Sequence, residues 1–228
     1  MEGAPWIERA REVRDRIYGE PLPAGLVVVP TDEQTYWRRH EAELRHAFPP
    51  EFYFHRRERD VPLAQPDALP PRIEDYLLLM DGDRLAGVTS GFAGREPRSV
   101  YWTNHTTLDT AYQGRGVYRA LQERVIAYTR ELGFRAIQSN HAPSNNGALI
   151  PKLRAGFKIV SLELDGLEGP ILRLRYFHDP EEEAAYLFRN GNATLSPELI
   201  GRGHGGIALL RAQFREADEA ERGRAGDP

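Results

Sequence analysis

The sequence predicts a mixed α/β domain in which a mostly antiparallel sheet is flanked by helices, and three observations support this class. Short runs rich in β-branched and aromatic residues alternate with longer amphipathic segments. A helical pattern lies between two predicted strands, at about 117–132, and a crossover helix implies a parallel strand pair. A chain of 228 residues without cysteine is long enough to bury a core with no disulfide.

The N-terminal part is predicted from periodicity and from Pro and Gly punctuation. Apolar residues at helical spacing indicate the first helix, a Val run ended by Pro30 indicates a strand, and Thr31 or Asp32 is a cap for the next helix. An Asp-Gly-Asp turn separates two further strands. The expected elements are a helix at 5–18, a strand at 26–29, a helix at 32–47, an irregular proline-rich loop at 48–72, and strands at 76–80, 85–89 and 99–108.

The C-terminal part begins with the clearest helix. Its apolar residues follow steps of four, four, three and four, and Gly133 occupies the position of a left-handed C-terminal cap; they are Val117, Leu121, Val125, Tyr128 and Leu132. The remaining expected elements are a strand at 135–139, a helix at 145–155 ended by Gly156, strands at 158–164 and 171–177, and helices at 181–190 and 197–217. We expect a helical extension at 1–25, one domain at 26–177 and a C-terminal helical extension at 178–228.

Composition excludes several function classes. The formal charge of −4 gives no basic surface for phosphate backbones, so we expect no nucleic-acid partner; the basic run at 55–60 is interrupted by acids. No run of about 18 apolar residues predicts a membrane span, and the first residues lack the apolar core of a secretory signal. The histidines form no metal-ligand spacing, so we expect no metal. Absence of cysteine fits the reducing cytoplasm.

A glycine-containing turn joins the predicted strand at 99–108 to the helix that follows. The first amides of a helix have no intrahelical acceptor and lie at the positive end of the dipole, so such a turn can bind a pyrophosphate. A dinucleotide fingerprint needs a third glycine where Arg119 stands, and a Walker loop needs Gly-Lys-Ser/Thr, which is absent. The pattern of an acetyl-CoA loop, Gln/Arg-x-x-Gly-x-Gly/Ala, matches at Gln113 and Gly116 and departs at Tyr118. An ordinary glycine turn before a helix is the alternative.

A second match lies one strand downstream. The stretch from Asn145 to Phe157 contains an Asn, then Ala-Leu, then a terminal Gly-Phe. Both matches, their chain order and the β-β-β-α-β-α-β-β pattern of 76–177 together resemble the GNAT (GCN5-related N-acetyltransferase) superfamily. The resemblance implies a GNAT-like sheet, acetyl-CoA as co-substrate and acetylation of an amine on a small molecule or peptide.

The resemblance also implies a set of cofactor-binding residues. Strand residues would offer backbone groups to the pantetheine arm, the turn amides would hold the pyrophosphate, and Asn145 would fix the cofactor arm. Arg115 and Arg119 would add charged contacts, or are solvent-facing helix charges. The full implied set is Thr106, Thr107, Leu108, Gln113, Gly114, Arg115, Gly116, Val117, Tyr118, Arg119 and Asn145.

The catalytic residues depart from the family's pattern. Lys152 stands where a general-acid Tyr is frequent; a Lys serves there only if burial lowers its pKa, and an exposed helix residue is the alternative. Trp102 and Asn104 stand where a Glu or His base is frequent; Trp102 suits an acceptor pocket and Asn104 can hold a water. His105 is a candidate base that a β-bulge would move to the face of Asn104, and His141 is another.

Two rival functions follow from these departures. One is a non-catalytic acyl-CoA-binding module with a degenerate active site. The other is an interaction protein in which the terminal helices matter most. The apolar stripe of the C-terminal helices, from Leu199 to Phe214, suits either a core or a homodimer contact.

Overall fold

The computed structural model describes residues 3–47, 72–94, 99–165 and 169–190. By contacts the chain divides into two compact units, Met1–His178 and Asp179–Pro228. The predicted loop at 48–72, apart from its last residue, and the predicted helix at 197–217 lie outside the described residues, so these expectations, like the domain boundaries and the homodimer, stay predictions.

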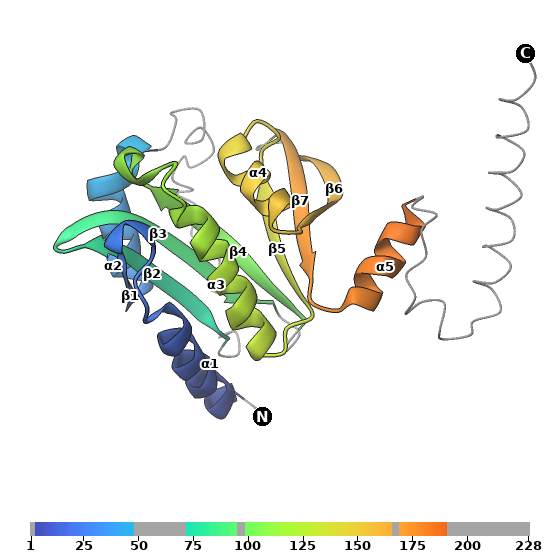
Figure 1. Ribbon diagram of the computed structural model, residues 1–228, viewed down its shortest axis with the longest axis horizontal. Coiled ribbons are helices and arrows are strands. Elements are labelled where there is room, and N and C mark those ends of the chain that lie inside the picture. The colour runs from blue at the N-terminus through green and yellow to red at the C-terminus, as the bar shows by residue number, and fades with distance from the viewer. Residues whose placement is uncertain (1–2, 48–71, 95–98, 166–168, 191–228) are drawn as a thin grey trace, which may run out of the picture. The chain divides into compact units, whose positions relative to one another are not determined.

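The first unit is built on a seven-stranded sheet with the order β1-β2-β3-β4-β5-β7-β6 (Figure 1). The parallel pair is β4 with β5, as the crossover helix predicted, and the other neighbours are antiparallel. The strands are β1 (Val27–Thr31), β2 (Glu74–Asp81), β3 (Arg84–Ala93), β4 (Val100–Leu108), β5 (Ala136–His141), β6 (Lys158–Asp165) and β7 (Gly169–Phe177). The predicted fold class, mixed α/β with flanking helices, is confirmed.

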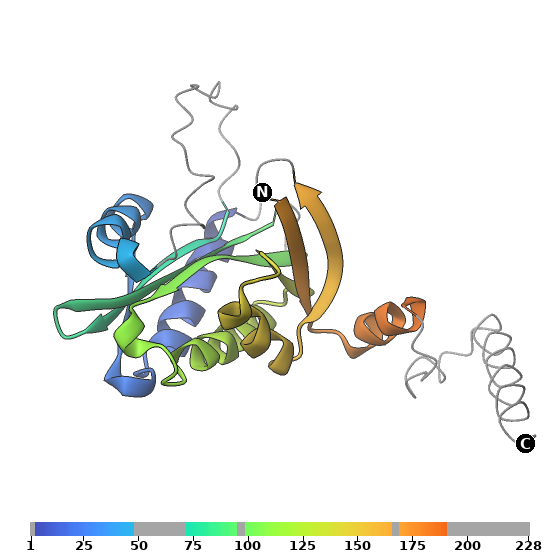
Figure 2. The same ribbon diagram turned by 90° about the horizontal axis from the view of Figure 1, so that it is seen from above.

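Helices flank both faces of the sheet. They are α1 (Gly3–Tyr18), α2 (Glu33–Arg39), α3 (Val117–Glu131) and α4 (Asn146–Arg154). Strand alternation in β2 separates the two layers: Leu77 and Leu79 pack in the core that includes α1 and α3, whereas Leu78 packs with Tyr36 and Leu44 on the α2 face (Figure 2). All five apolar residues predicted for the α3 face are buried.

Several element bounds differ from the prediction, among them those of β3, which extends to Ala93 beyond the predicted strand at 85–89, and two other differences have local physical reasons. Strand β1 continues through Pro30, which pairs with Leu77, because β1 is at the edge of the sheet, where a missing N–H is tolerated. The predicted helix at 32–47 is helical throughout but changes type: α2 is followed by a π turn, His40–Leu44, and a 3₁₀ turn, Arg45–Ala47. Asp32 caps α2, accepting from the Thr35 amide at 2.8 Å.

The second unit contains one described helix, α5 (Pro180–Arg189). Asp179 caps it by accepting from the Glu181 amide at 2.8 Å, and acidic residues occupy its first turn. No helix in the described ranges combines the length and the apolar character needed to cross a bilayer.

Candidate active site

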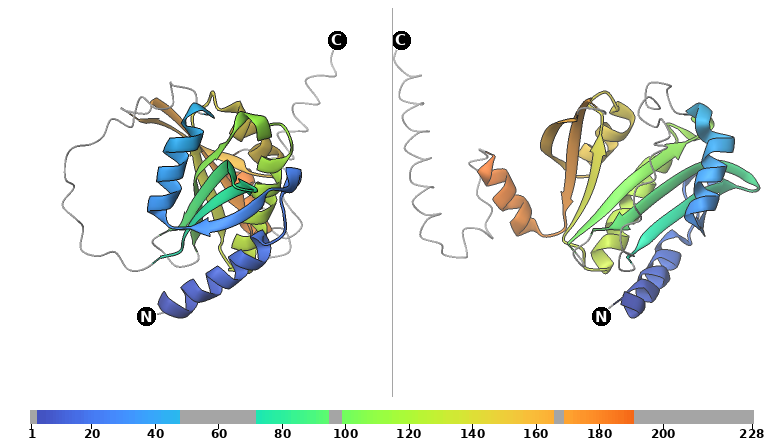
Figure 3. Two further views of the ribbon diagram at one scale, coloured as in Figure 1. Left: turned by 90° about the vertical axis from the view of Figure 1, so that its left-hand side faces the viewer. Right: turned by 180° about the vertical axis from the view of Figure 1, so that it is seen from behind.

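Strands β4 and β5 pair over a short stretch and then separate. Their parallel register covers only Val100–Trp102 against Ala136–Gln138, and beyond it the two strands diverge, as Figure 3 shows from behind the molecule. A groove with a volume of about 1220 Å³ lies at this end of the molecule, lined by the end of β4, the first turns of α3, and residues before and along the whole of α4. This volume exceeds the roughly 300–1,000 Å³ of typical small-molecule pockets, so the groove has room for a ligand as large as a cofactor.

The wall formed by the start of α3 has the properties of an anion site. Gly114 and Gly116 have φ values of 70° and 81°, so the turn depends on left-handed residues at these two positions. Within the described residues, α3 has no side-chain cap and no acid in its first turn, whereas α2 and α5 are capped by aspartates. The first amides of α3 are therefore available to an anionic group in the groove.

Gln113 and Asn145 act on the backbone around the groove. The Gln113 side chain donates to the Leu108 carbonyl at 3.0 Å and so ties the turn to the end of β4. The Asn145 side chain accepts from the Ala148 amide at 3.2 Å and caps α4. Both residues also line the groove. The sequence motifs thus include residues that shape the walls as well as residues that face the interior.

The two arginines of the turn differ in position. Arg119 lines the groove, but its guanidinium is mostly exposed and pairs with Glu123 one turn later, Nε to Oε1 at 2.9 Å. The guanidinium of Arg115 lies 5.8 Å from the centre of the Tyr112 ring and is not part of the groove lining. Tyr118, where the resembled pattern has a small residue, borders the groove, and burial raises the pKa of its hydroxyl.

The geometry brings together nearly the whole predicted cofactor set. All of its members except Arg115 border the groove: Thr106, Thr107, Leu108, Gln113, Gly114, Gly116, Val117, Tyr118, Arg119 and Asn145. Their role in binding stays a prediction.

Lys152 is buried, which excludes the alternative that it is an exposed residue on the surface of a helix. It extends from α4 toward β4, is 1% exposed, and its Nζ donates to Thr103 Oγ1 at 2.7 Å. Nζ also lies 4.8 Å from the centre of the Phe157 ring. Burial lowers the pKa of Lys152 to about 7, the condition on which its use as an acid depended.

His141 of β5 is a weak base in this environment. Burial and, second, the charge of Lys152 lower the pKa of His141 to about 3, and its Nε2 lies 2.9 Å from Ser139 Oγ. His141 is therefore neutral near pH 7 and accepts a proton less readily than an ordinary histidine.

Strand β4 contains a β-bulge in which Asn104 is the extra residue, just before His105. Ser90 of β3 pairs with His105 and Gly91 pairs with Thr103, so Asn104 has no partner in the register and is exposed. The extra residue places His105 on the α2 face, where its Nδ1 lies 2.8 Å from the Tyr36 hydroxyl and its ring 5.0 Å from Trp37. The β-bulge that the sequence analysis considered for His105 is therefore present in the structure.

Trp102 is nearly stacked on Phe92, with ring centroids 6.4 Å apart and an angle of 14° between the ring planes.

Three residues with polar groups near the site were absent from the sequence-based set: Tyr36, His40 and Thr103. Nothing local singled them out, because their contacts depend on the bulge and on the divergence of β4 and β5. In the described part of the chain no three His, Asp or Glu side chains gather as a metal site.

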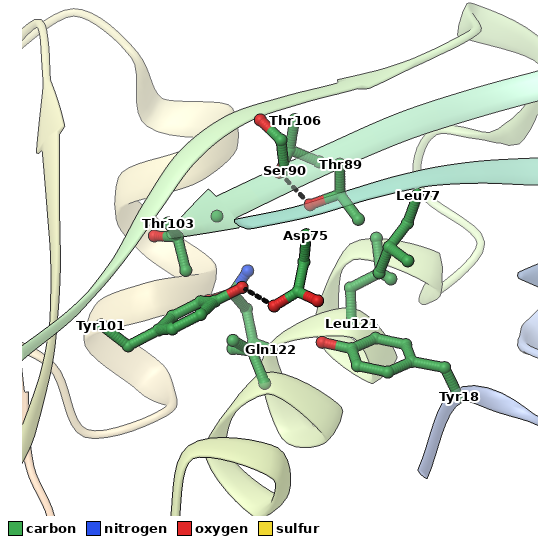
Figure 4. A pocket seen from close by; sticks show the side chains of 12 residues that line it. Tyr18, Asp75, Leu77, Thr89, Ser90, Tyr101, Thr103, Thr106, Leu121 and Gln122 are labelled. Carbon is green, nitrogen blue, oxygen red and sulfur yellow. Dashed lines mark hydrogen bonds between the residues drawn. The ribbon is translucent and has the colours of Figure 1, made fainter. Parts of the chain in front are cut away.

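A second, small polar cavity of about 20 Å³ lies between the sheet and α3 (Figure 4). The Asp75 carboxylate is 4% exposed there and accepts from the hydroxyls of Tyr101 at 2.8 Å and Tyr128 at 3.0 Å. Arg14 Nη1 lies 3.5 Å from the other carboxylate oxygen. This cavity has room for about one water and none for a substrate.

Similarity to solved structures is low in identity and concerns the fold. The chain is 20% identical to nourseothricin acetyltransferase, covering 46% of this chain and 66% of that chain with a TM-score of 0.42. It is 17% identical to the ribosomal-protein-S18-alanine N-acetyltransferase of Escherichia coli (67% and 93% covered, TM-score 0.48) and 17% identical to a Bacillus subtilis acetyltransferase in complex with CoA (67% and 98% covered, TM-score 0.46).

A comparison with curated proteins gives no match. The model of the acetyltransferase (GNAT) family matches residues 35–157, a stretch that includes β2 to β5, α3, α4 and the glycine turn. Since this match spans more than half of the sequence, the chain belongs to the acetyltransferase (GNAT) family.

Proposed function

We propose that this chain is an enzyme that moves an acetyl group from acetyl-CoA directly to an amine of a small molecule or peptide. One observation supports this most: a large groove at the divergence of β4 and β5 combines an uncapped helix start with a buried lysine close by. Acetyl transfer is the general activity of the family; the amine acceptor and the direct route are our proposal. Absence of cysteine supports the cytoplasm as its location.

In the proposed binding mode the chain acts mostly through its backbone. The amides at the start of α3 hold the pyrophosphate, and the end of β4, from Thr106 to Leu108, offers backbone groups to the pantetheine arm. A side chain as large as Tyr118 is compatible with this role, because amides rather than side chains do the binding. Asn145 caps the start of α4 at the opposite wall of the groove.

In the proposed chemistry the acceptor nitrogen attacks the thioester carbon, a C–N bond forms and the C–S bond breaks. His105 takes the proton that the amine loses, with Asn104 holding a water at the bulge. Lys152, whose pKa near 7 leaves it about half protonated at neutral pH, gives a proton to the departing thiolate. No cysteine in the sequence can carry the acetyl group, which favours direct transfer.

Two measurements on the wild-type protein test this proposal. Calorimetry with CoA should show binding, and release of free thiol from acetyl-CoA should depend on an added amine from a panel of polyamines, aminoglycosides and peptide N-termini. Gly116→Val, which strains a left-handed residue and covers the amides, should weaken CoA binding about tenfold or more. Absence of CoA binding would contradict the proposal, and binding without thiol release would favour the non-catalytic module.

The direct route has its own test. Initial rates at varied acetyl-CoA and amine should give intersecting double-reciprocal lines, and intact mass after incubation with acetyl-CoA alone should be unchanged. Parallel lines together with an acetylated protein would indicate a covalent intermediate instead.

A further inference from the structure

Four polar side chains form a continuous chain of contacts on the α2 face of the sheet. The Tyr36 hydroxyl lies 2.8 Å from His105 Nδ1, and His105 Nε2 lies 3.1 Å from Thr107 Oγ1. Thr107 Oγ1 in turn lies 3.4 Å from Nε2 of His40. The two imidazole rings meet edge to face with centroids 4.7 Å apart. Two histidines thus share one hydroxyl group beside the groove that Thr107 lines.

His40 is held by a local change in helix type. It is 1% exposed and opens the π turn that follows α2, and Ala47, three residues after that turn, borders the groove. π turns occur frequently at functional sites. Among the described residues, the titratable and charged groups near these four include Glu41, the Arg39–Glu43 pair, His46 with Asp109, and Tyr76 of β2.

Hydrogen counting restricts the protonation of the two rings. Thr107 has a single hydroxyl hydrogen, so it donates to one histidine while the other donates to it. When both histidines are neutral, a complete chain therefore requires one ring to be protonated at Nε2 and the other at Nδ1. One direction is favoured electrostatically: the Glu41 carboxylate lies 3.7 Å from His40 Nδ1, too far for a hydrogen bond, but its negative charge favours a hydrogen at that nitrogen.

With that direction, every group in the chain has a defined role. His40 is protonated at Nδ1 and accepts from Thr107 at Nε2, Thr107 accepts from His105 Nε2–H, and His105 Nδ1 accepts from Tyr36. When His105 gains a proton at Nδ1, the Tyr36 hydroxyl can turn toward the His105 carbonyl oxygen, 3.5 Å away. The links through Thr107 to His40 stay intact and stabilise the charged ring.

We propose that His40 is a positioning residue that acts through the Thr107 hydroxyl to fix the tautomer of His105 and to stabilise its protonated form. The inference rests on the proposed function, because His105 is the base in that proposal. The proposal adds His40, which lies outside the acetyl-CoA loop, to the residues that support the reaction. It also gives the Thr107 hydroxyl a role of its own, beside the proposed role of the Thr107 backbone in holding the pantetheine arm.

Nitrogen-15 imidazole NMR tests the chain without any turnover, with His40→Gln and His105→Gln used for assignment. We expect neutral His40 in the Nδ1–H form and neutral His105 in the Nε2–H form. In Thr107→Val this fixed pairing should be lost, and Thr107→Ser should restore it. The same tautomer in both rings, or an unchanged pairing in Thr107→Val, would overturn the proposal even if no acceptor amine is known.

Kinetics provide the second readout. His40→Leu should lower kcat about tenfold and move the rising limb of the pH–rate profile to lower pH, because His105 becomes a weaker base. His40→Gln, whose side-chain amide oxygen can accept from the Thr107 hydroxyl, should recover part of the lost kcat and part of the shift in the rising limb. His46→Leu, an exposed histidine in the same helical segment, is the matched control and should match wild type. A uniform loss of rate at every pH, with the limb unmoved, would show that His40 is merely structural.

Discussion

Two buried ionisable side chains each form a hydrogen bond with a residue of β4, and they differ in what surrounds them. Asp75 has two tyrosine hydroxyls and an arginine around its carboxylate, beside a cavity that admits about one water. Lys152 has one neutral hydroxyl, Thr103, and the face of the Phe157 ring, and among the described residues no ion-pair partner. Burial raises the pKa of Asp75 and lowers that of Lys152.

The comparison teaches that burial of a titratable group does not by itself indicate function. Asp75 is compensated on all sides, and its network joins β2, β4, α1 and α3, which suits a structural role. Lys152 pays a desolvation cost with little compensation and lies next to the large groove. Uncompensated burial is the more informative sign, since a fold has no structural reason to keep it.

The largest expected effect is on stability, at Asp75. Asp75→Ala would leave two buried hydroxyls without their acceptor and would leave Arg14 paired with Asp15 alone, so the free energy of unfolding should fall by about 3 kcal/mol. Urea denaturation measures this, with exposed Asp83→Ala as a control expected to stay within about 0.5 kcal/mol of wild type. CoA affinity of the folded variant should be unchanged. A tenfold loss of affinity would contradict the separation of the two regions.

The next effect is the pH dependence of stability, at Lys152. Unfolded, this amine binds a proton up to its ordinary pKa of 10.5, whereas folded it does so only up to about 7. Burial therefore destabilises the fold fully below pH 7, and the penalty fades as pH rises from 7 to 10.5. Lys152→Met should be more stable than wild type, with an advantage that shrinks by about 3 kcal/mol between pH 7 and 9.5.

Denaturation of both proteins across this pH range measures the advantage. The only other lysine, Lys158, provides the matched variant Lys158→Met, which should show no such trend. An advantage of Lys152→Met that stayed constant with pH would mean that Lys152 titrates normally.

A third effect, on rate, separates stability from activity at the same residue. Lys152→Met should lower kcat for thiol release about 100-fold, because the departing thiolate loses its proton donor. Its CoA affinity should stay within about twofold of wild type, since Lys152 is outside the amide-lined wall. Full activity in this variant would show that water or another group donates the proton to the thiolate. Lys152 would then have a structural role, as Asp75 does.

Much of this arrangement followed from local pattern. The spacing from Val117 to Leu132 predicted the buried face of α3, and Gly116 and Gly133 both have the left-handed conformation that their positions require. Such features depend on residues within a few turns of one another, and a single sequence contains them.

The features that were not predicted depend on distant residues. Lys152 lies in a helix between Pro151 and Leu153, and only the divergence of β4 from β5, set by pairing that ends at Trp102, makes a space for its side chain. The bulge at Asn104 lies opposite Gly91 of β3, but a glycine on the partner strand does not show which residue of β4 is extra, and the bulge decides the face of His105. Partners such as Thr103 become visible only once the strands are placed.

The smallest expected effect concerns that partner. The Thr103 hydroxyl accepts from Lys152, which favours the charged amine, so Thr103→Val should lower the pKa of Lys152 further, by up to about one unit. Because the acid must be protonated, the falling limb of the pH–rate profile should move to lower pH, and kcat at pH 7 should drop a few-fold. Thr103→Ser should behave like wild type. The sequence contains just two lysines, so NMR of carbon-13-labelled lysine follows the titration of Lys152 directly. A Lys152 pKa that did not move in Thr103→Val would show that this hydroxyl has no part in tuning the amine, and that burial alone sets its value.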